Sequence, residues 1–428
     1  MADVATTFST LSNDAPNVYI AREMFRLSER NLRIGKYAKL HTLPQRMSKT
    51  LRVVRYKRLN LPFSTLTEGT PPDAVALATE NVDVTVEQWG IVVLLTDVAL
   101  ITTVHPALQI AIDRTSLAIA EVLEREMANV LLSGTQVYFP GTATSRPTIG
   151  SSDKMDTATV LKSTVALRNL GAGEQEGGLF GGVMAPQQEG DVLSADQTFK
   201  DASNFANVRA LQFGEIGIWM GVRWARGNFL PIFKGVPTPS TTAATAEKAQ
   251  IVVVGGGASM AGSLVVVVAR DITTNYERKI SQTFTVTDVT GAFNVIAPSS
   301  ANYVYDIYVS DTAGLNFKKL FSRVAASSTN LVNATIYAAG TLATPPSAPA
   351  DQREVFVAWV FGLDSFGRVE LNGMSLESYI TPPGASFSNP LAQGRKVGTK
   401  IMWKSFIIDN NFFARIESAS AFSAQLPS

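Results

Sequence analysis

The chain has 428 residues, of which 46% are hydrophobic and 17% charged, and its formal net charge is +1. This length exceeds what one hydrophobic core supports, so we expect two or three domains, and the composition excludes a disordered chain. The balanced charge excludes attraction of the whole chain to nucleic acid. The absence of cysteine excludes disulfides, thiolate zinc sites and cysteine nucleophiles.

The N-terminal segment is predicted to be an arm without a core of its own. Residues 1–17 are small and polar, and the pattern becomes helical from Ala21 to Arg33. The first residues lack the basic and apolar regions of a signal peptide, and no run of about 18 apolar residues follows. We therefore expect no signal peptide and no membrane contact.

Basic residues dominate the chain between Ile20 and Asn60, where only Glu23 and Glu29 oppose them. Three interpretations remain open: pairing with acidic surface on adjacent subunits, sequence-independent contact with nucleic-acid phosphates, and a solvated face. Aromatic residues are scarce here, so base stacking is not expected. The candidate basic-arm residues are Arg22, Arg26, Arg30, Arg33, Lys36, Lys39, Arg46 and Lys49, and Arg52, Arg55, Lys57 and Arg58 follow them.

A long two-stranded excursion is predicted over Thr50–Leu95. Thr50–Leu59 alternates apolar and basic residues, Val82–Leu95 is a second strand run, and Thr67–Pro72 between them is a loop tip rich in Thr, Gly and Pro. An isolated two-stranded ribbon is marginally stable in water. We therefore expect a neighbouring subunit to support it.

The clearest helical pattern spans Pro106–Leu132, roughly 27 residues or ~40 Å. Pro106 suits the first helical position, and Gly134 suits the position after the last turn. A second helix is predicted over Thr157–Leu170, ended by Gly171, and a strand over Phe180–Ala185.

Short strands and turns fill the chain between the Pro-rich segments 236–242 and 345–349. About 100 residues with regular strand spacing predict an immunoglobulin-like sandwich, inserted into a surrounding domain and removable from it. The predicted strands are Gln250–Val254, Ser263–Arg270, Thr283–Val289, Ala292–Ile296, Tyr303–Ser310 and Leu331–Ala338.

The motifs that could carry catalysis or bind a cofactor fail on their details. The turn Gly255–Gly262 has Met260 where a dinucleotide fingerprint needs glycine, and Ser263 stands where a P-loop needs lysine. A strand is predicted after this turn, whereas phosphate binding uses a helix N-terminus. The two histidines, His41 and His105, lie far apart in the sequence. We expect no metal site, no cofactor and no enzymatic activity.

The C-terminal segment predicts two strands, Gly394–Ser405 and Phe412–Ser418, joined by the polar turn Asp409–Asn411. Three motifs precede it: Thr67–Pro72, then Val82–Gly90 with Thr96-Asp97, then Val360–Gly367. In this order and spacing the four motifs resemble a tailed-bacteriophage major capsid protein of the Hong Kong 97 (HK97) fold, in the branch typified by coliphage N-four. The resemblance covers roughly residues 15–235 and 350–418.

The resemblance implies an α+β chain built from the parts of that family, interrupted by the all-β Ig-like insertion. These parts are an N-terminal arm (1–49), an extended loop with flanking strands (50–104), a spine helix of the peripheral domain (105–150), an axial domain (151–239 and 347–394) around the insertion (240–346), and C-terminal peripheral strands with a tail (395–428). It also implies inter-subunit contacts by the loop-tip residues Thr67, Glu68, Gly69, Thr70, Pro71 and Pro72.

The function that the resemblance implies is self-assembly as hexamers and pentamers into an icosahedral head shell around double-stranded DNA. The implied partners are other copies of the chain, DNA bound without sequence specificity, and scaffold, portal and decoration proteins. The implied location is the virion capsid, and the host cytoplasm during assembly. An encapsulin-like bacterial compartment is the alternative within the fold, and a β-rich adhesin or enzyme with an Ig-like module is the alternative outside it.

Overall fold

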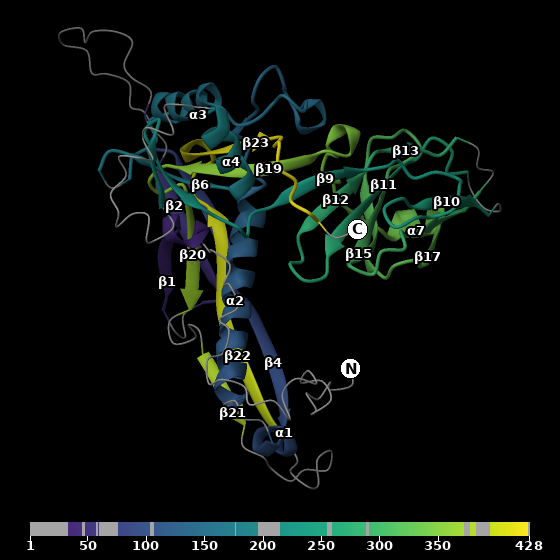
Figure 1. The fold of residues 1–428 in the computed structure, drawn as a ribbon, viewed down its shortest axis with the longest axis horizontal. Coiled ribbons are helices and arrows are strands. Elements are labelled where there is room, and N and C mark those ends of the chain that lie inside the picture. Colours follow the sequence, from purple (N-terminus) through teal and green to yellow (C-terminus); the bar gives the residue numbers. More distant parts are fainter. Residues whose placement is uncertain are drawn as a thin grey trace. The chain divides into compact units, whose positions relative to one another are not determined.

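The computed structural model describes residues 33–44, 48–56, 59, 76–102, 107–175, 177–195, 215–254, 259–287, 291–371, 377–381 and 394–426 (Figure 1). They form two compact units, each built from separate stretches of the chain. The described part of unit 1 comes from Ala38–Val130 and Asp364–Asp409. That of unit 2 comes from Arg30–Tyr37, Leu131–Leu363 and Asn410–Ser428.

A mixed five-stranded sheet is the framework of unit 1. Its longest strand, β22 (Gly394–Ile407), pairs in antiparallel fashion with three others, and β20 pairs in parallel with β1. The remaining strands are β1 (Lys39–Leu43), β4 (Glu87–Thr96), β20 (Phe366–Leu371) and β21 (Glu377–Thr381).

Helix α2 (Ala107–Leu131) covers one face of this sheet. Every second residue of β22 from Val397 to Ser405 is buried, as the period of a strand with one covered face requires. Ala111 of α2 forms a small core with Leu95 and Val397, and the hydroxyl oxygens of Thr115 and Thr399 lie 2.8 Å apart. The short helix α1 (Asp97–Thr102) precedes α2 in the chain.

Strands β2 (Thr50–Tyr56) and β3 (Thr79–Thr85) form a separate antiparallel pair, which we call the ribbon. The predicted strand run Val82–Leu95 is wrong as a single element. Val86 is fully buried, and after it the chain leaves β2 and joins β22 as strand β4. The described two-stranded part is therefore shorter than expected, because the chain changes partners where Val86 enters the core.

Unit 2 contains a 13-stranded sheet, part of which continues into the inserted block. On this sheet lie α3 (Thr157–Asn169) and α4 (Pro186–Ala195), whose Val160, Leu167 and Val192 pack with Trp224 and Ile416. The strands before and after the insertion are β5 (Val137–Tyr138), β6 (Phe180–Met184), β7 (Glu215–Trp219), β8 (Val222–Arg226), β9 (Ile232–Val236), β19 (Glu354–Phe361) and β23 (Phe413–Ser418). Single-turn 3-10 helices are Ile34–Tyr37, Arg146–Thr148, Ala350–Gln352 and Asn410–Phe412.

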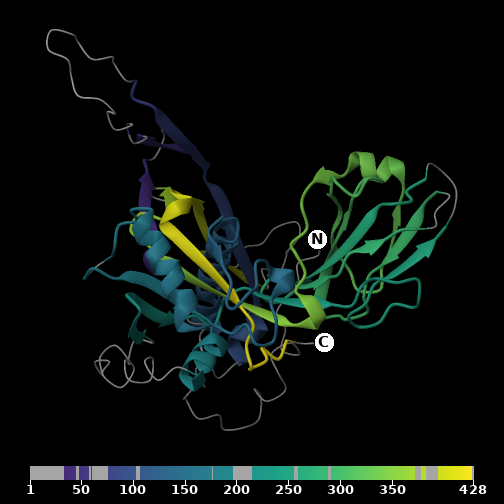
Figure 2. The ribbon, with the colours of Figure 1, turned by 90° about the horizontal axis from the view of Figure 1, so that it is seen from above.

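The inserted block has two β layers, which Figure 2 shows in green from above. Strands β10, β14 and β17 form one layer, and the second is the continuation of the large sheet. Ile251 and Phe293 from the first layer pack against Val267 and Ile307 from the second. The elements are β10 (Gln250–Val253), β11 (Leu264–Asp271), β12 (Glu277–Ser281), β13 (Phe284–Thr285), β14 (Phe293–Ile296), β15 (Tyr303–Val309), β16 (Lys318–Val324), β17 (Thr329–Val332), α7 (Ala334–Ala339) and β18 (Thr341–Leu342).

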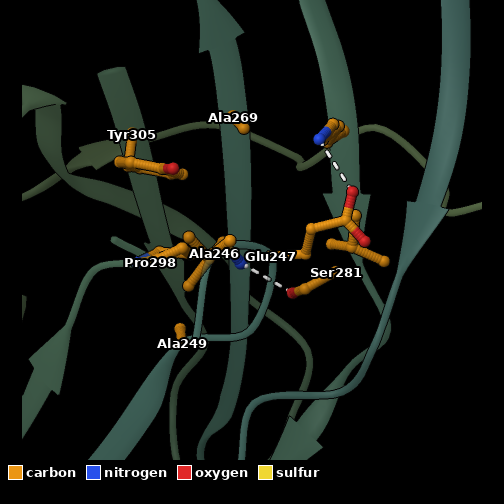
Figure 3. Close-up of a pocket in the computed structure, with 10 residues that line it drawn as sticks. Ala246, Glu247, Ala249, Ala269, Ser281, Pro298 and Tyr305 are labelled. Carbon is orange, nitrogen blue, oxygen red and sulfur yellow. Dashed lines mark hydrogen bonds and ion pairs between the residues drawn. The ribbon is translucent and has the colours of Figure 1, made fainter. Parts of the chain in front are cut away.

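The block is joined to the rest of unit 2 by a parallel pairing of β12 with β9. This pairing places Lys279 opposite Lys234, and Glu247 accepts hydrogen bonds from both amines, at 2.8 Å and 3.4 Å. Figure 3 shows Glu247 in this position, at a pocket of only ≈ 10 Å³ that also includes Ser281 and Tyr305. That volume holds at most one water molecule, so the pocket is a packing gap beside the β9–β12 pairing and not a ligand site.

Two of the predicted helices are confirmed. Helix α2 matches the prediction Pro106–Leu132 within the described residues, and α3 matches Thr157–Leu170, with Gly171 at φ +74° after it. Pro106 lies outside the described residues. Gly134 has no left-handed conformation: its lack of a side chain leaves room for the Phe413 ring.

Three helices within the described residues were not predicted. In α1, Ala99 N–H donates to the Thr96 hydroxyl, so Thr96-Asp97 begins a helix. Helix α4 begins at Pro186 and is mostly polar, and its Gln188 is fully buried. Helix α7 replaces the second half of the predicted strand Leu331–Ala338, because the Asn333 side chain accepts from Ile336 N–H and caps a helix there.

The prediction for the C-terminal strands also needs correction, and two strands of the block 240–346 were not predicted. The C-terminal strands lie in different sheets: β22 belongs to the sheet of unit 1, while β23 pairs with β19 and β5 in unit 2. The strands β12 and β16 were not predicted, because their sequences are rich in Lys and Arg.

We predict that Glu247→Gln destabilises unit 2 by about 3 kcal/mol at neutral pH, because it leaves the buried Lys279 amine without its counter-charge. Burial raises the pKa of Glu247, but the hydrogen bonds and charges of Lys279 and Lys234 outweigh this and lower it. Because the pKa of Glu247 is lower in the folded protein than in the unfolded chain, the ionised carboxylate stabilises the fold at pH values above the unfolded pKa. This contribution is lost as the pH falls through the folded pKa.

Thermal unfolding followed by circular dichroism should therefore show a large difference between wild type and variant at pH 7 that narrows below about pH 4. Glu174→Gln is the matched control, since Glu174 pairs with Arg168 at a more exposed site. Equal melting temperatures for the two variants at pH 7 would contradict the prediction.

Candidate assembly surfaces

The described residues offer little material for catalysis. They contain no group of three or more His, Asp or Glu side chains that could hold a metal, and the chain has no cysteine. His41 lies on β1 with its ring 5.7 Å from that of Phe406. Burial, and then the charge of Lys39, lower the pKa of His41 against the opposing charge of Asp364. His105 and residues 255–258 of the Gly-rich turn lie outside the described residues.

Unit 2 has an open hollow of ≈ 380 Å³ that is large enough for a small ligand. Residues of α4, of the β8–β9 turn and of the β11–β12 turn line it. Its two charged side chains neutralise each other, since Arg278 Nε lies 3.1 Å from the Asp271 carboxylate. No unpaired charge is therefore directed at a ligand among the described lining residues. None of the helices in the described ranges is long and apolar enough to cross a membrane.

The ribbon rests on its own unit through one face. The cross-strand pairs Leu51–Val84 and Val53–Val82 lie on this face, and they pack against the buried residues Leu43, Val369 and Phe406. The sequence suggested that a neighbouring subunit supports the ribbon. The structure corrects this, because the base contributes to the core of unit 1.

The outer part of the described ribbon is different. Val54, Tyr56 and Leu77 are 49%, 64% and 60% exposed, and they flank the segment whose tip was predicted to contact a neighbour. The tip residues Thr67, Glu68, Gly69, Thr70, Pro71 and Pro72 lie outside the described residues, and their role stays a prediction. The apolar surface that needs a partner therefore begins beyond the ribbon base.

Several cations of the basic segment are neutralised within the chain. Lys39 Nζ lies 2.8 Å from Asp364, and Arg52 forms two hydrogen bonds of 2.6 Å to Asp83. Arg55 contacts both Glu80 on β3 and Asp409. These carboxylates lie far from the basic segment in sequence, so a count of charges along the segment missed them. The available signal was the presence of Glu80 and Asp83 on the returning strand β3, each opposite an arginine of β2.

The other basic-arm residues have varied positions. Arg33, Lys36 and Lys49 are described, while Arg22, Arg26, Arg30 and Arg46 lie outside the described residues, as do Lys57 and Arg58. Lys36 lies 6.0 Å from the ring of Tyr37, which stacks on Phe361 of β19 at 5.3 Å. Gly181 of β6 has no side chain, and this leaves room for the Tyr37 ring.

Comparison with known proteins was informative at the level of the fold. No protein-family model and no curated protein sequence matches the chain. The capsid of Ralstonia phage GP4 matches with a TM-score of 0.52, at 10% identity and over 100% of both chains. The capsid of cyanophage P-SCSP1u matches with a TM-score of 0.51, at 12% identity, over 94% of this chain and 92% of that one. The chain therefore has the mixed α/β fold of phage capsid proteins, end to end.

We predict that Arg55→Gln destabilises unit 1 by about 1 kcal/mol, whereas Arg52→Gln on the same strand leaves the stability close to that of the wild type. Arg55 forms ion pairs with two carboxylates, and one of them, the Asp409 side chain, is only 12% exposed. Arg52 pairs with Asp83 alone, and both side chains are largely solvated. Urea unfolding followed by circular dichroism measures both changes. Equal losses would contradict the assignment of Arg55 as the cation that holds the ribbon base.

Proposed function

We propose that the chain is the major capsid protein of a tailed bacteriophage of the HK97 type. In this proposal it assembles as hexamers and pentamers into an icosahedral head shell that encloses double-stranded DNA, and it has no enzymatic activity. The observation that carries the proposal is the fold match over the full length of two phage capsid chains. The order of the sequence motifs supports the branch typified by coliphage N-four.

The division of the chain supports the same proposal. Unit 1, with α2 and the long strand β22, corresponds to the peripheral domain, and the large sheet of unit 2 corresponds to the axial domain. The two-layered block 240–346 is the proposed Ig-like insertion. Other copies of the chain are the principal partner, and scaffold, portal and decoration proteins are further proposed partners in the virion and in the host cytoplasm during assembly.

Electron microscopy of the purified recombinant protein tests the proposal most directly. Capsomers or closed shells are the expected result, with sizing columns reporting a species far above 45.9 kDa. A monodisperse monomer that persists at high concentration, with and without added scaffold protein, would count decisively against it.

The first prediction from the proposal concerns the extended loop. Deletion of Leu61–Leu77, with a short Gly-Ser link from the end of β2 to the start of β3, should abolish shells. The reason is that a stable contact buries about 800 Å² per partner and the ribbon base alone offers little free apolar surface. The far-UV circular dichroism spectrum should stay close to wild type, since the ribbon base packs on its own unit. Normal shells from this deletion would refute the role of the loop.

The second prediction concerns the basic arm. The triple variant Arg26→Gln, Arg30→Gln, Arg33→Gln should lower shell yield or DNA retention, because it removes three positive charges of the basic segment that contacts with acidic neighbours or DNA phosphates would use. The difference from wild type should narrow as the salt concentration rises, since such contacts are screened and do not depend on base sequence. Assembly and packaging at wild-type levels across the salt range would leave a solvated face as the explanation.

A further inference from the structure

His41 lies where the ribbon packs on the sheet of unit 1. It is on β1, which pairs in parallel with β20 (Figure 1), and its ring lies 5.7 Å from that of Phe406 on β22. Phe406 reaches β1 across β20 because Gly367 has no side chain: a Cβ there would lie 3.1 Å from the Phe406 ring. Phe406 belongs to the buried cluster against which Val53 and Val84 of the ribbon pack. His41 therefore contacts a residue that supports the ribbon.

The surroundings of His41 favour a neutral imidazole over a charged one. The Nε2 atom of His41 is buried and forms no hydrogen bond to any described residue. A buried nitrogen without an acceptor costs more free energy once it carries a proton and a charge. Burial, and then the charge of Lys39, lower the pKa of His41, and the charge of Asp364 only partly opposes them.

The carboxylates around this site already have other cations as partners. The ion pairs are Lys39 of β1 with Asp364 before β20, Lys404 of β22 with Glu87 of β4, and Arg55 of the ribbon with Glu80 and Asp409. On β20 itself, Val369 lies beside His41, so its neighbours Arg368 and Glu370 point to the opposite face, where they pair with each other. A protonated His41 would have to compete with a lysine or an arginine for each carboxylate on its own face.

We propose that protonation of His41 loosens the packing of the ribbon on unit 1. At neutral pH the uncharged ring stays in contact with Phe406. A charged ring is drawn toward water, and the contact that supports the ribbon is lost. Because the ribbon carries the predicted extended loop, mild acid would weaken the support of that loop within a single subunit.

The direction of the pH effect follows from the two states of His41. In the opened state the ring is in water and takes up a proton near pH 6.5, as a histidine of an unfolded chain does. Because the pKa of His41 is lower in the packed state, that state loses stability as the pH falls below about 6.5. The loss is complete once the pH has passed the pKa of the packed state. Asp and Glu side chains protonate near pH 4, so the window above about pH 5 reports on histidine.

Proton NMR tests the first step, since the chain has only two histidines and His105→Asn assigns their imidazole signals. The pKa of His41 should lie below about 6.5. Lys39→Gln should raise it, because this change removes a charge that lowers the pKa and frees Asp364. Arg52→Gln on the outer side of the ribbon is the matched control and should leave it unchanged. A pKa of His41 at or above about 6.5, or an equal rise in both variants, would overturn the inference.

Hydrogen exchange followed by mass spectrometry tests the second step on the unassembled subunit. The protection of the β3 amides, corrected for the chemical exchange rate, should fall between about pH 7.5 and about pH 5. The fall should be about tenfold for each pH unit by which the pKa of His41 lies below about 6.5. His41→Phe keeps an aromatic ring against Phe406 without a titrating group, so it should abolish this fall. His41→Gln is a second neutral variant with the same expected result.

The amides of α3 in unit 2 are the internal control, and their protection should change equally in wild type and in the two neutral variants. A fall in β3 protection that persists in both neutral variants, or one that α3 shares, would contradict the proposal. None of these measurements requires shells. Failure of the capsid proposal would therefore leave this inference intact, and its own failure would leave the capsid function standing.

Discussion

The parallel pairing of β9 with β12 is the contact on which the architecture of unit 2 depends. It consists of only three residue pairs, and one of them sets Lys234 opposite Lys279. Two like charges in adjacent strands repel each other. Glu247, which precedes β10, accepts a hydrogen bond from each of the two amines. Its negative charge lies between the two lysines and offsets their repulsion. The insertion therefore supplies the residue that makes its own attachment favourable.

The two ends of the block 240–346 lie close together beside this pairing. Gly235 N–H donates to the Arg353 carbonyl, and the Gln282 side chain donates to the Pro349 carbonyl, so the strands entering and leaving the block lie side by side. Neighbouring ends are what an inserted domain requires. Because the sheet crosses the border, the block is an extension of the large sheet of unit 2, and not a domain on a separate linker.

The sequence was most informative where apolar periodicity decides the structure. Helix α2 and strands β11 and β15 are such elements, and their positions follow from their apolar residues. Strand β12 was missed because Arg278 and Lys279 look solvated in the sequence but are buried beside Asp271 and Glu247. Strand β16 was missed for the same reason, since Lys319 pairs with the fully buried Asp306. Such strands are stabilised by partners remote in sequence, and local patterns do not contain that information.

The same limit applied to the candidate surfaces. Three interpretations of the basic residues before Asn60 were open from the sequence, and none of them included pairing within the chain; yet Asp364 and Asp409, more than 300 positions away, neutralise two of these residues.

The adjacent glycines 181 and 182 of β6 illustrate a constraint of another kind. The Tyr37 ring occupies the place of a side chain at Gly181, and Val222 with Trp224 occupies the corresponding place at Gly182. The two sides of this strand are thus covered by bulky residues that reach over bare backbone. A methyl group at either position would displace one of these bulky residues from the core, so we expect substitutions of the two glycines to be tolerated less well than those of most surrounding residues. In distant relatives, a glycine pair in the strand before a helix that begins with Pro should therefore help to align the large sheet of unit 2.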